Sequence, residues 1–92
     1  MQIIFKDRFS SSLDMILDFI AQDSLDRAIR FNQQLNRHIN TIPDMPYKYR
    51  KSFYHHNDNI RDMIFKGYTI PYMINEDNIA ILDIFKWTDK QN

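Results

Sequence analysis

The sequence predicts one small α+β domain with the element order β-α-α-β-β-β, in which an antiparallel meander packs against an N-terminal helical hairpin. Two apolar stripes with helical spacing follow each other between residues 9 and 42, and β-branched and aromatic runs fill much of residues 60–85. A chain of 92 residues suits one hydrophobic core, so residues 1–92 are expected to form a single domain.

The N-terminal segment predicts a strand followed by an amphipathic helix. Gln2–Phe5 is a short β-branched and aromatic run, and the oxygens of Asp7 and of the serines at 10–12 are available to cap a helix. One apolar stripe then follows at helical spacing: Phe9, Leu13, Ile16, Leu17 and Ile20. We therefore expect a helix that buries this side.

A second helix is predicted directly after the first. Asp23 or Ser24 can cap it, and Pro43 ends it. Its predicted apolar stripe is Leu25, Ala28, Ile29, Leu35, Ile39 and Ile42, with polar Asn32 within it. Because only two or three residues join the helices, they must be antiparallel neighbours whose apolar side seeks a sheet.

The C-terminal part of the chain predicts three strands. Residues 60–65 and 68–74 flank Lys66-Gly67, a plausible two-residue hairpin turn, and residues 79–85 form the last strand. Pro71 lacks a backbone N–H, so its strand is expected to carry a bulge there or to expose that side. The segment before them, residues 44–59, has no sustained period and is expected to be part loop and part ragged strand.

Charge and composition limit the function classes. Twelve Lys and Arg balance twelve Asp and Glu, so no overall positive field attracts the chain to nucleic acid. Cysteine is absent, which excludes disulfides and thiolate metal sites and agrees with a cytoplasmic location. No apolar run is long enough to span a membrane. No metal site and no cofactor is predicted.

A local basic patch is nevertheless present between residues 46 and 68. It has five cations against two carboxylates, an excess of three positive charges: Lys48, Arg50, Lys51, Arg61 and Lys66 against Asp58 and Asp62. Such a patch can hold a few phosphates or an acidic segment of a partner, or it can be an ordinary solvated surface. Aromatic residues alternate with the cations over residues 47–54, which suits either base stacking or a half-buried strand.

The C-terminal half resembles the RelE/ParE toxins of type II toxin–antitoxin systems, which have this element order. The resemblance is carried by Ile60-Arg61-Asp62-Met63-Ile64, by Gly67-Tyr68-Thr69-Ile70-Pro71-Tyr72 and by Ile79-Ala80-Ile81-Leu82-Asp83-Ile84. Tyr68 and Tyr72 lie four apart on one strand and so share a face, where they either cover the helical hairpin or contact a partner. The resemblance implies a toxin that inhibits growth, of the kind that stabilises plasmids.

The resemblance leaves two targets. A ParE-like toxin binds DNA gyrase, whereas a RelE-like mRNA interferase cleaves messages on the ribosome and needs a base, a cation and a proton donor. Thr69 stands where such nucleases have a basic residue, and the C-terminus has no His or Tyr, so the ParE-like interpretation is favoured. A nuclease would have to rely on Arg61, Lys86, His55 and His56.

Both interpretations imply a cognate antitoxin that covers the functional surface, with a homodimer or a hetero-oligomer as the assembled form. Sheet edges and an apolar groove beside the helical hairpin are the expected docking places. The candidate residues for binding a target or partner are Arg50, Lys51, Arg61, Lys66, Tyr68, Tyr72, Lys86 and Trp87.

Overall fold

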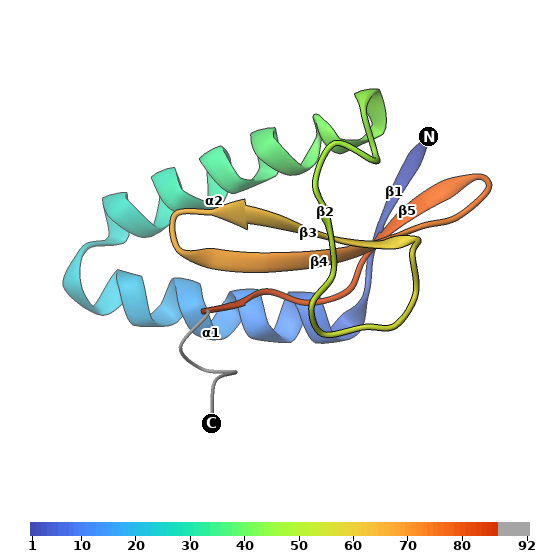
Figure 1. Ribbon diagram of the computed structural model, residues 1–92. Coiled ribbons are helices and arrows are strands. Elements are labelled where there is room, and N and C mark those ends of the chain that lie inside the picture. The colour runs from blue at the N-terminus through green and yellow to red at the C-terminus, as the bar shows by residue number, and fades with distance from the viewer. Residues whose placement is uncertain (87–92) are drawn as a thin grey trace.

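The computed structural model describes residues 1–86 and confirms the α+β class (Figure 1). The elements in chain order are β1 (Gln2–Phe5), α1 (Asp7–Asp23), α2 (Leu25–Ile39), the 3₁₀ turn η1 (Ile42–Asp44), β2 (Arg50–Lys51), β3 (Ile60–Phe65), β4 (Tyr68–Ile74), β5 (Asn78–Ile81) and β6 (Phe85–Lys86). The predicted order is therefore present, with β2 added and the predicted last strand divided into β5 and β6.

The strands form one mixed sheet with the order β1-β5-β4-β3-β2, and β6 also pairs with β4. Strands β3, β4 and β5 make the predicted antiparallel meander. β1 pairs in parallel with β5, so the first and last parts of the chain lie side by side. The strands at the two ends of this order are thus β1 and the two-residue strand β2, which form the two main edges of the sheet.

Both helices pack on one side of the sheet, which we call the helix face, and the opposite side is the open face (Figure 1). The core between the layers joins helix residues to strand residues: Phe9, Phe31, Leu35, Ile39, Met63, Phe65, Ile70, Tyr72, Ile79 and Ile81 are all buried. The predicted stripe of α1 is confirmed, because Phe9 is buried and its other members pack against this core.

The predicted stripe of α2 was partly wrong. Leu25 and Ile29 are exposed, and Phe31 takes the place in the core that was assigned to them. The buried positions Ala28, Phe31, Leu35 and Ile39 repeat at three, four and four residues. This spacing follows the period of 3.6 residues that places side chains on one side of a helix. The large Phe31 ring meets Phe65 and Tyr68 edge to face, and this contact fixes the rotation of the helix.

The helix boundaries follow the predicted signals only in part. Ser24 caps α2, with its Oγ accepting from the Arg27 N–H at 3.2 Å, and it is the only residue between the helices. The N-cap of α1 is Lys6, which makes no side-chain cap, so the prediction that Asp7 or the serines cap this helix was wrong. Pro43 lies in η1, beyond the end of α2.

The β3–β4 hairpin has the predicted two-residue turn. Lys66 has φ 49° and Gly67 has φ 84°, and Phe65 pairs with Tyr68 across them. Positive φ at both central residues is the geometry of a type I′ turn, whose twist matches that of the flanking strands. The turn therefore fixes the register that places Tyr68 and Tyr72 on the helix face.

Pro71 leaves β4 unbroken, and the interruption falls on its neighbour instead. The Ile74 N–H donates to the Asn59 carbonyl at 2.8 Å, and because hydrogen-bonded pairs alternate along antiparallel strands, the backbone of Pro71 faces the last strand. There the Pro71 carbonyl accepts from the Leu82 N–H at 2.9 Å, and the strand breaks between β5 and β6. The missing N–H thus explains why the predicted strand 79–85 is two strands.

Candidate functional site

Residues 45–59, which we call the strap, cross the sheet and contain β2 (Figure 1). Arg61 in β3 holds both ends of it. The Arg61 guanidinium donates to the backbone carbonyls of Tyr47 at 3.3 Å and Tyr49 at 3.1 Å, and its Nε donates to that of Asp58 at 3.2 Å. It also lies 4.9 Å from the centre of the Tyr47 ring. Arg61 is therefore occupied by the protein's own backbone.

Asp62, the next residue, holds the strap from the opposite side of the sheet, as alternation along a strand requires. Its carboxylate is buried, accepts from the Phe53 N–H at 3.3 Å and lies 3.7 Å from Nη2 of Arg50. Arg50 in turn stacks on the Phe53 ring, 4.0 Å from its centre. Two consecutive residues of the Ile-Arg-Asp motif thus fasten one loop on both sides of the sheet.

The two tyrosines of the Gly-Tyr-x-x-x-Tyr pattern are buried on the helix face. Tyr72 donates from its hydroxyl to the Pro46 carbonyl at 2.5 Å and meets the Tyr49 ring edge to face. Burial raises the pKa of the Tyr72 hydroxyl well above its ordinary value, and Tyr49 adds to the rise. Tyr72 is therefore part of the core, whereas one side of Tyr68 lies in a surface cavity.

The residues proposed for a nuclease do not meet in one place within residues 1–86. His55, on the strap, has Nδ1 3.1 Å from Ser52 Oγ and lines a small cavity of about 290 Å³ with Arg8 and Asp83. Neither Arg61 nor Lys86 lines that cavity. His56 is exposed on the strap, and Trp87 lies outside the described residues.

A groove lies at the end of the domain where α1 turns into α2. It consists of two adjoining cavities of about 820 Å³ and about 480 Å³ that share Phe19 and Tyr68. Its apolar lining comes from α1, α2 and the sheet and comprises Met15, Ile16, Phe19, Ile20, Phe31, Tyr68, Ile84 and Phe85. Phe19 is 68% exposed and Met15 is 74% exposed, so large apolar surface faces solvent here.

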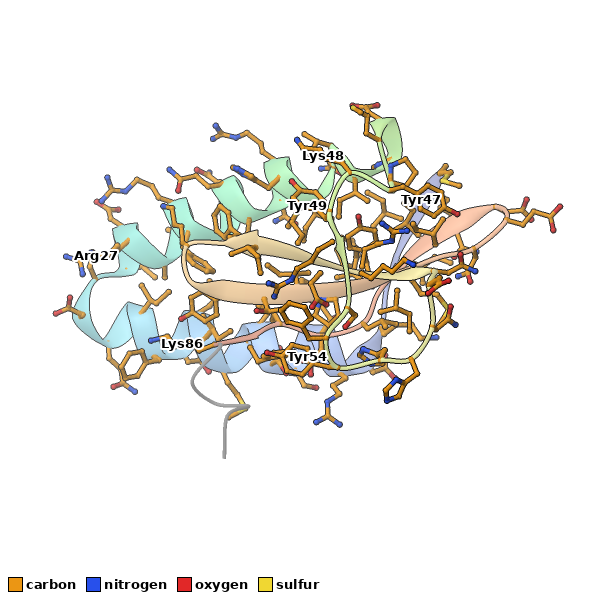
Figure 2. The ribbon with its side chains drawn as sticks, in the orientation of Figure 1. Arg27, Tyr47, Lys48, Tyr49, Tyr54 and Lys86 are labelled. Atoms are coloured by element: carbon orange, nitrogen blue, oxygen red, sulfur yellow. The ribbon has the colours of Figure 1, made fainter. Side chains whose placement is uncertain are left out.

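Four cations line this groove: Arg27, Arg30, Lys66 and Lys86. Arg27 is paired with Asp23 at 2.9 Å, and Lys66 contacts the side-chain oxygen of Gln34. Lys86 lies over the Tyr68 ring, with Nζ 5.6 Å from its centre. Figure 2 shows Arg27 and Lys86 toward one end of the molecule and Tyr47 toward the other. The groove thus combines an exposed apolar floor with a mainly basic rim.

Sequence reasoning placed Lys66, Tyr68 and Lys86 among the binding residues but missed Met15 and Phe19, and also Arg27 and Arg30. Met15 and Phe19 lie four residues apart and off the core stripe of α1, so the two side chains share another face of the helix. This second apolar pair was a usable signal. Lys86 in β6 completes the groove. It lies far from α1 in the sequence, and residue spacing does not indicate that the two elements are neighbours.

Within residues 1–86, no group of three or more acidic or histidine side chains is arranged to hold a metal ion. Among the helices of the same residues, none has the length and apolar character that a membrane span requires.

Comparisons with known proteins give one family and one fold. The family described as "ParE toxin of type II toxin-antitoxin system, parDE" has a sequence model that matches residues 3–88. The structure is similar to a chain of the chromosomal ParDE toxin–antitoxin system from P. aeruginosa, with a TM-score of 0.75, 15% identity, and coverage of 94% of this chain and 95% of that one.

A second solved structure, of a conserved hypothetical protein from Helicobacter pylori, is similar with a TM-score of 0.55 and 15% identity, over 96% of both chains. No curated protein matches the chain in sequence. At 15% identity these two structures show a common fold and nothing further.

Proposed function

Because this chain belongs to the ParE toxin family of type II toxin–antitoxin systems, we propose that it is the cytoplasmic toxin of such a pair, that it stops growth by binding DNA gyrase, and that an antitoxin neutralises it by docking in the groove. The observation that carries the proposal is the groove itself. It gathers Phe19, Tyr68 and Lys86 from three separate elements into one surface.

The chemistry of the groove selects the kind of partner segment. Exposed side chains such as Phe19 and Met15 gain most when an apolar side chain covers them. Cations on the rim favour carboxylates at the margins of the bound segment. The partner is therefore an amphipathic segment of the antitoxin with apolar residues on one side and acidic residues beside them.

Inhibition by binding, and not by RNA cleavage, is supported by the places of the basic residues. Arg61 donates to three backbone carbonyls, and Arg50 lies beside the buried Asp62. These side chains therefore stabilise the fold. Lys86 and His55 line separate cavities. On the strap, Lys51 is paired with Asp58 at 3.4 Å and Lys48 lies 5.4 Å from the centre of the Tyr49 ring, so these cations also make contacts within the domain.

The target is tested with the purified chain in two assays. In a DNA supercoiling reaction, we expect the toxin to inhibit gyrase and to increase the amount of cleaved DNA. In a translation reaction, we expect messages to stay intact. Messages cut at codon-aligned positions, with gyrase unaffected, would show instead a ribosome-dependent mRNA interferase, and Arg61, Lys86, His55 and His56 would be the residues to substitute next.

The docking place is tested with one pair of variants. Met15→Glu introduces a negative charge among the groove's apolar side chains, and we expect antitoxin affinity to fall by about tenfold or more. Leu25→Glu is the matched control, because Leu25 is also a large exposed helix residue, at 66%, but does not line the groove. Equal loss of affinity in both variants, measured by calorimetry, would contradict docking in the groove.

A further inference from the structure

The two edges of the sheet differ in how they are protected from other strands. An unpaired edge offers a row of N–H and C=O groups, and proteins usually protect it with charge, proline, a bulge or a very short strand. β2 has two of these features, since it is two residues long and consists of Arg50 and Lys51. β1 has none of them over Gln2–Phe5.

β1 is also apolar on both of its faces. Ile4 is 38% exposed and points to the open face, in register with Ala80 and Met73, while Phe5 is 45% exposed on the helix face beside Phe9. Leaving such side chains in water costs free energy that pairing with another strand recovers. The edge therefore fits an apolar partner strand.

The hydrogen bonds of β1 show which backbone groups are directed outward. The N–H groups of Gln2 and Lys6 donate toward Asp77 and Ile81, at 3.4 Å and 3.0 Å, so the even residues bond to the interior of the sheet. By alternation, Ile3 and Phe5 direct their N–H and C=O groups away from β5. No other strand lies beside them within residues 1–86.

We propose that β1 pairs with β1 of a second copy of this chain, antiparallel and centred on Ile4, so that the two sheets become one. In this register Ile3 faces Phe5 of the other copy and both outward residues exchange backbone hydrogen bonds, while Ile4 faces Ile4 between them. Lys6 falls opposite Gln2, so no like charges meet.

Two further properties favour a second copy as the occupant. The sequence of the strand is complementary to itself in this register, as an interface with twofold symmetry requires. The net formal charge of the chain is zero, so two copies do not repel each other at long range. A four-residue strand forms an interface well under the roughly 1,000 Å² of stable complexes, so the dimer is expected to dissociate on dilution.

Pairing through β1 leaves the groove accessible, because no residue of β1 lines it. A dimer would therefore carry two antitoxin sites, and an antitoxin with two linked docking segments would bind it with an avidity that a monomer does not allow. The inference about β1 does not depend on the proposed target or on the antitoxin.

Sedimentation velocity over a concentration series tests the register. The wild-type chain should change from monomer to dimer as concentration rises. Ile4→Lys and Ile4→Glu should each stay monomeric, because each places like charges face to face across the twofold axis. An equimolar mixture of the two variants should sediment as a dimer, since lysine then faces glutamate.

Ile64→Lys is the matched control, because Ile64 is an apolar residue, 48% exposed, on the open face near the opposite edge. It should dimerise like the wild type, and unfolding curves establish that all variants are folded. A wild-type chain that stays monomeric throughout, a mixture that does not associate, or equal dissociation by Ile64→Lys would each overturn the proposal. If the wild type stays monomeric and Ile4→Lys no longer binds the antitoxin, the edge is a binding site for the antitoxin instead.

Discussion

The strap and the groove both contain the cations and aromatic residues that suggest binding, but they use them differently. Arg61 of β3 donates to three carbonyls of the strap, and Arg50 on the strap lies between the buried Asp62 and the Phe53 ring. In the groove, Phe19 projects into solvent and Lys86 lies above Tyr68 at the rim. One region is occupied by internal contacts, and the other is the proposed docking surface.

The difference teaches that residue type alone does not separate stability from recognition. A guanidinium whose Nε and Nη1 already donate to carbonyls can no longer bind a phosphate or carboxylate through two of its nitrogens. An exposed phenylalanine beside a cavity gains free energy only from a group outside the domain. Substitutions in the strap should therefore change folding, and those in the groove should change binding.

Arg61→Ala should show the largest effect on stability. It removes three hydrogen bonds from a charged group and frees both ends of the strap, so we expect the free energy of unfolding to fall by about 3 kcal/mol. Denaturant unfolding measures this change. Arg30→Ala, an exposed groove cation, is the control and should change stability by less than about 0.5 kcal/mol. Equal effects would remove the distinction between the two regions.

Tyr72→Phe should have a smaller effect, about 1 kcal/mol at neutral pH, because it leaves the Pro46 carbonyl without its donor. It should also alter the response to alkali. The pKa of Tyr72 is raised from its ordinary value of 10.0, so folded chains keep the proton where unfolded chains lose it. Stability from this group is complete below about pH 10 and declines as pH rises.

The phenylalanine variant should lose that part of the decline when unfolding is followed by circular dichroism above about pH 10. Tyr47→Phe is the control, since Tyr47 is exposed at 55%, and it should keep the wild-type slope. An unchanged slope in Tyr72→Phe would show that the hydroxyl is not buried as described.

Lys86→Gln should give the smallest effect, a reduction in antitoxin affinity of about 0.5 kcal/mol, or roughly twofold. The charge is on the rim, so its contribution is screened by salt. Affinity measured at low and high salt should differ less for the variant than for the wild type. A loss that is independent of salt would indicate that Lys86 acts through its contact with Tyr68.

The sequence was sufficient for features that depend on neighbouring residues. The helical stripe of α1, the Lys66-Gly67 turn and the shared face of Tyr68 and Tyr72 all follow from local periodicity, and the structure confirms them. The β-α-α-β-β-β order, together with the motifs at residues 60–64, 67–72 and 79–84, also identified the family whose model matches residues 3–88.

What the sequence did not predict depends on contacts between distant residues. Parallel pairing of β1 with β5 joins residues 2–5 to residues 78–81. The spacing of residues along the sequence does not predict which distant strands pair. Arg61 was assigned to binding because a cation in a motif suggests a ligand, whereas its partners are carbonyls twelve and fourteen residues away. Phe19 was missed because only the core stripe of α1 was considered.

The central claim is tested most directly by measuring two quantities on two variants: antitoxin affinity and the free energy of unfolding for Phe19→Glu and Arg61→Ala. We expect Phe19→Glu to lower affinity by about a hundredfold, or about 2.7 kcal/mol, with stability unchanged. Arg61→Ala should lower stability and leave the affinity of the folded chain near that of the wild type. The opposite pattern, with affinity lost in Arg61→Ala and kept in Phe19→Glu, would contradict the assignment of binding to the groove and structure to the strap.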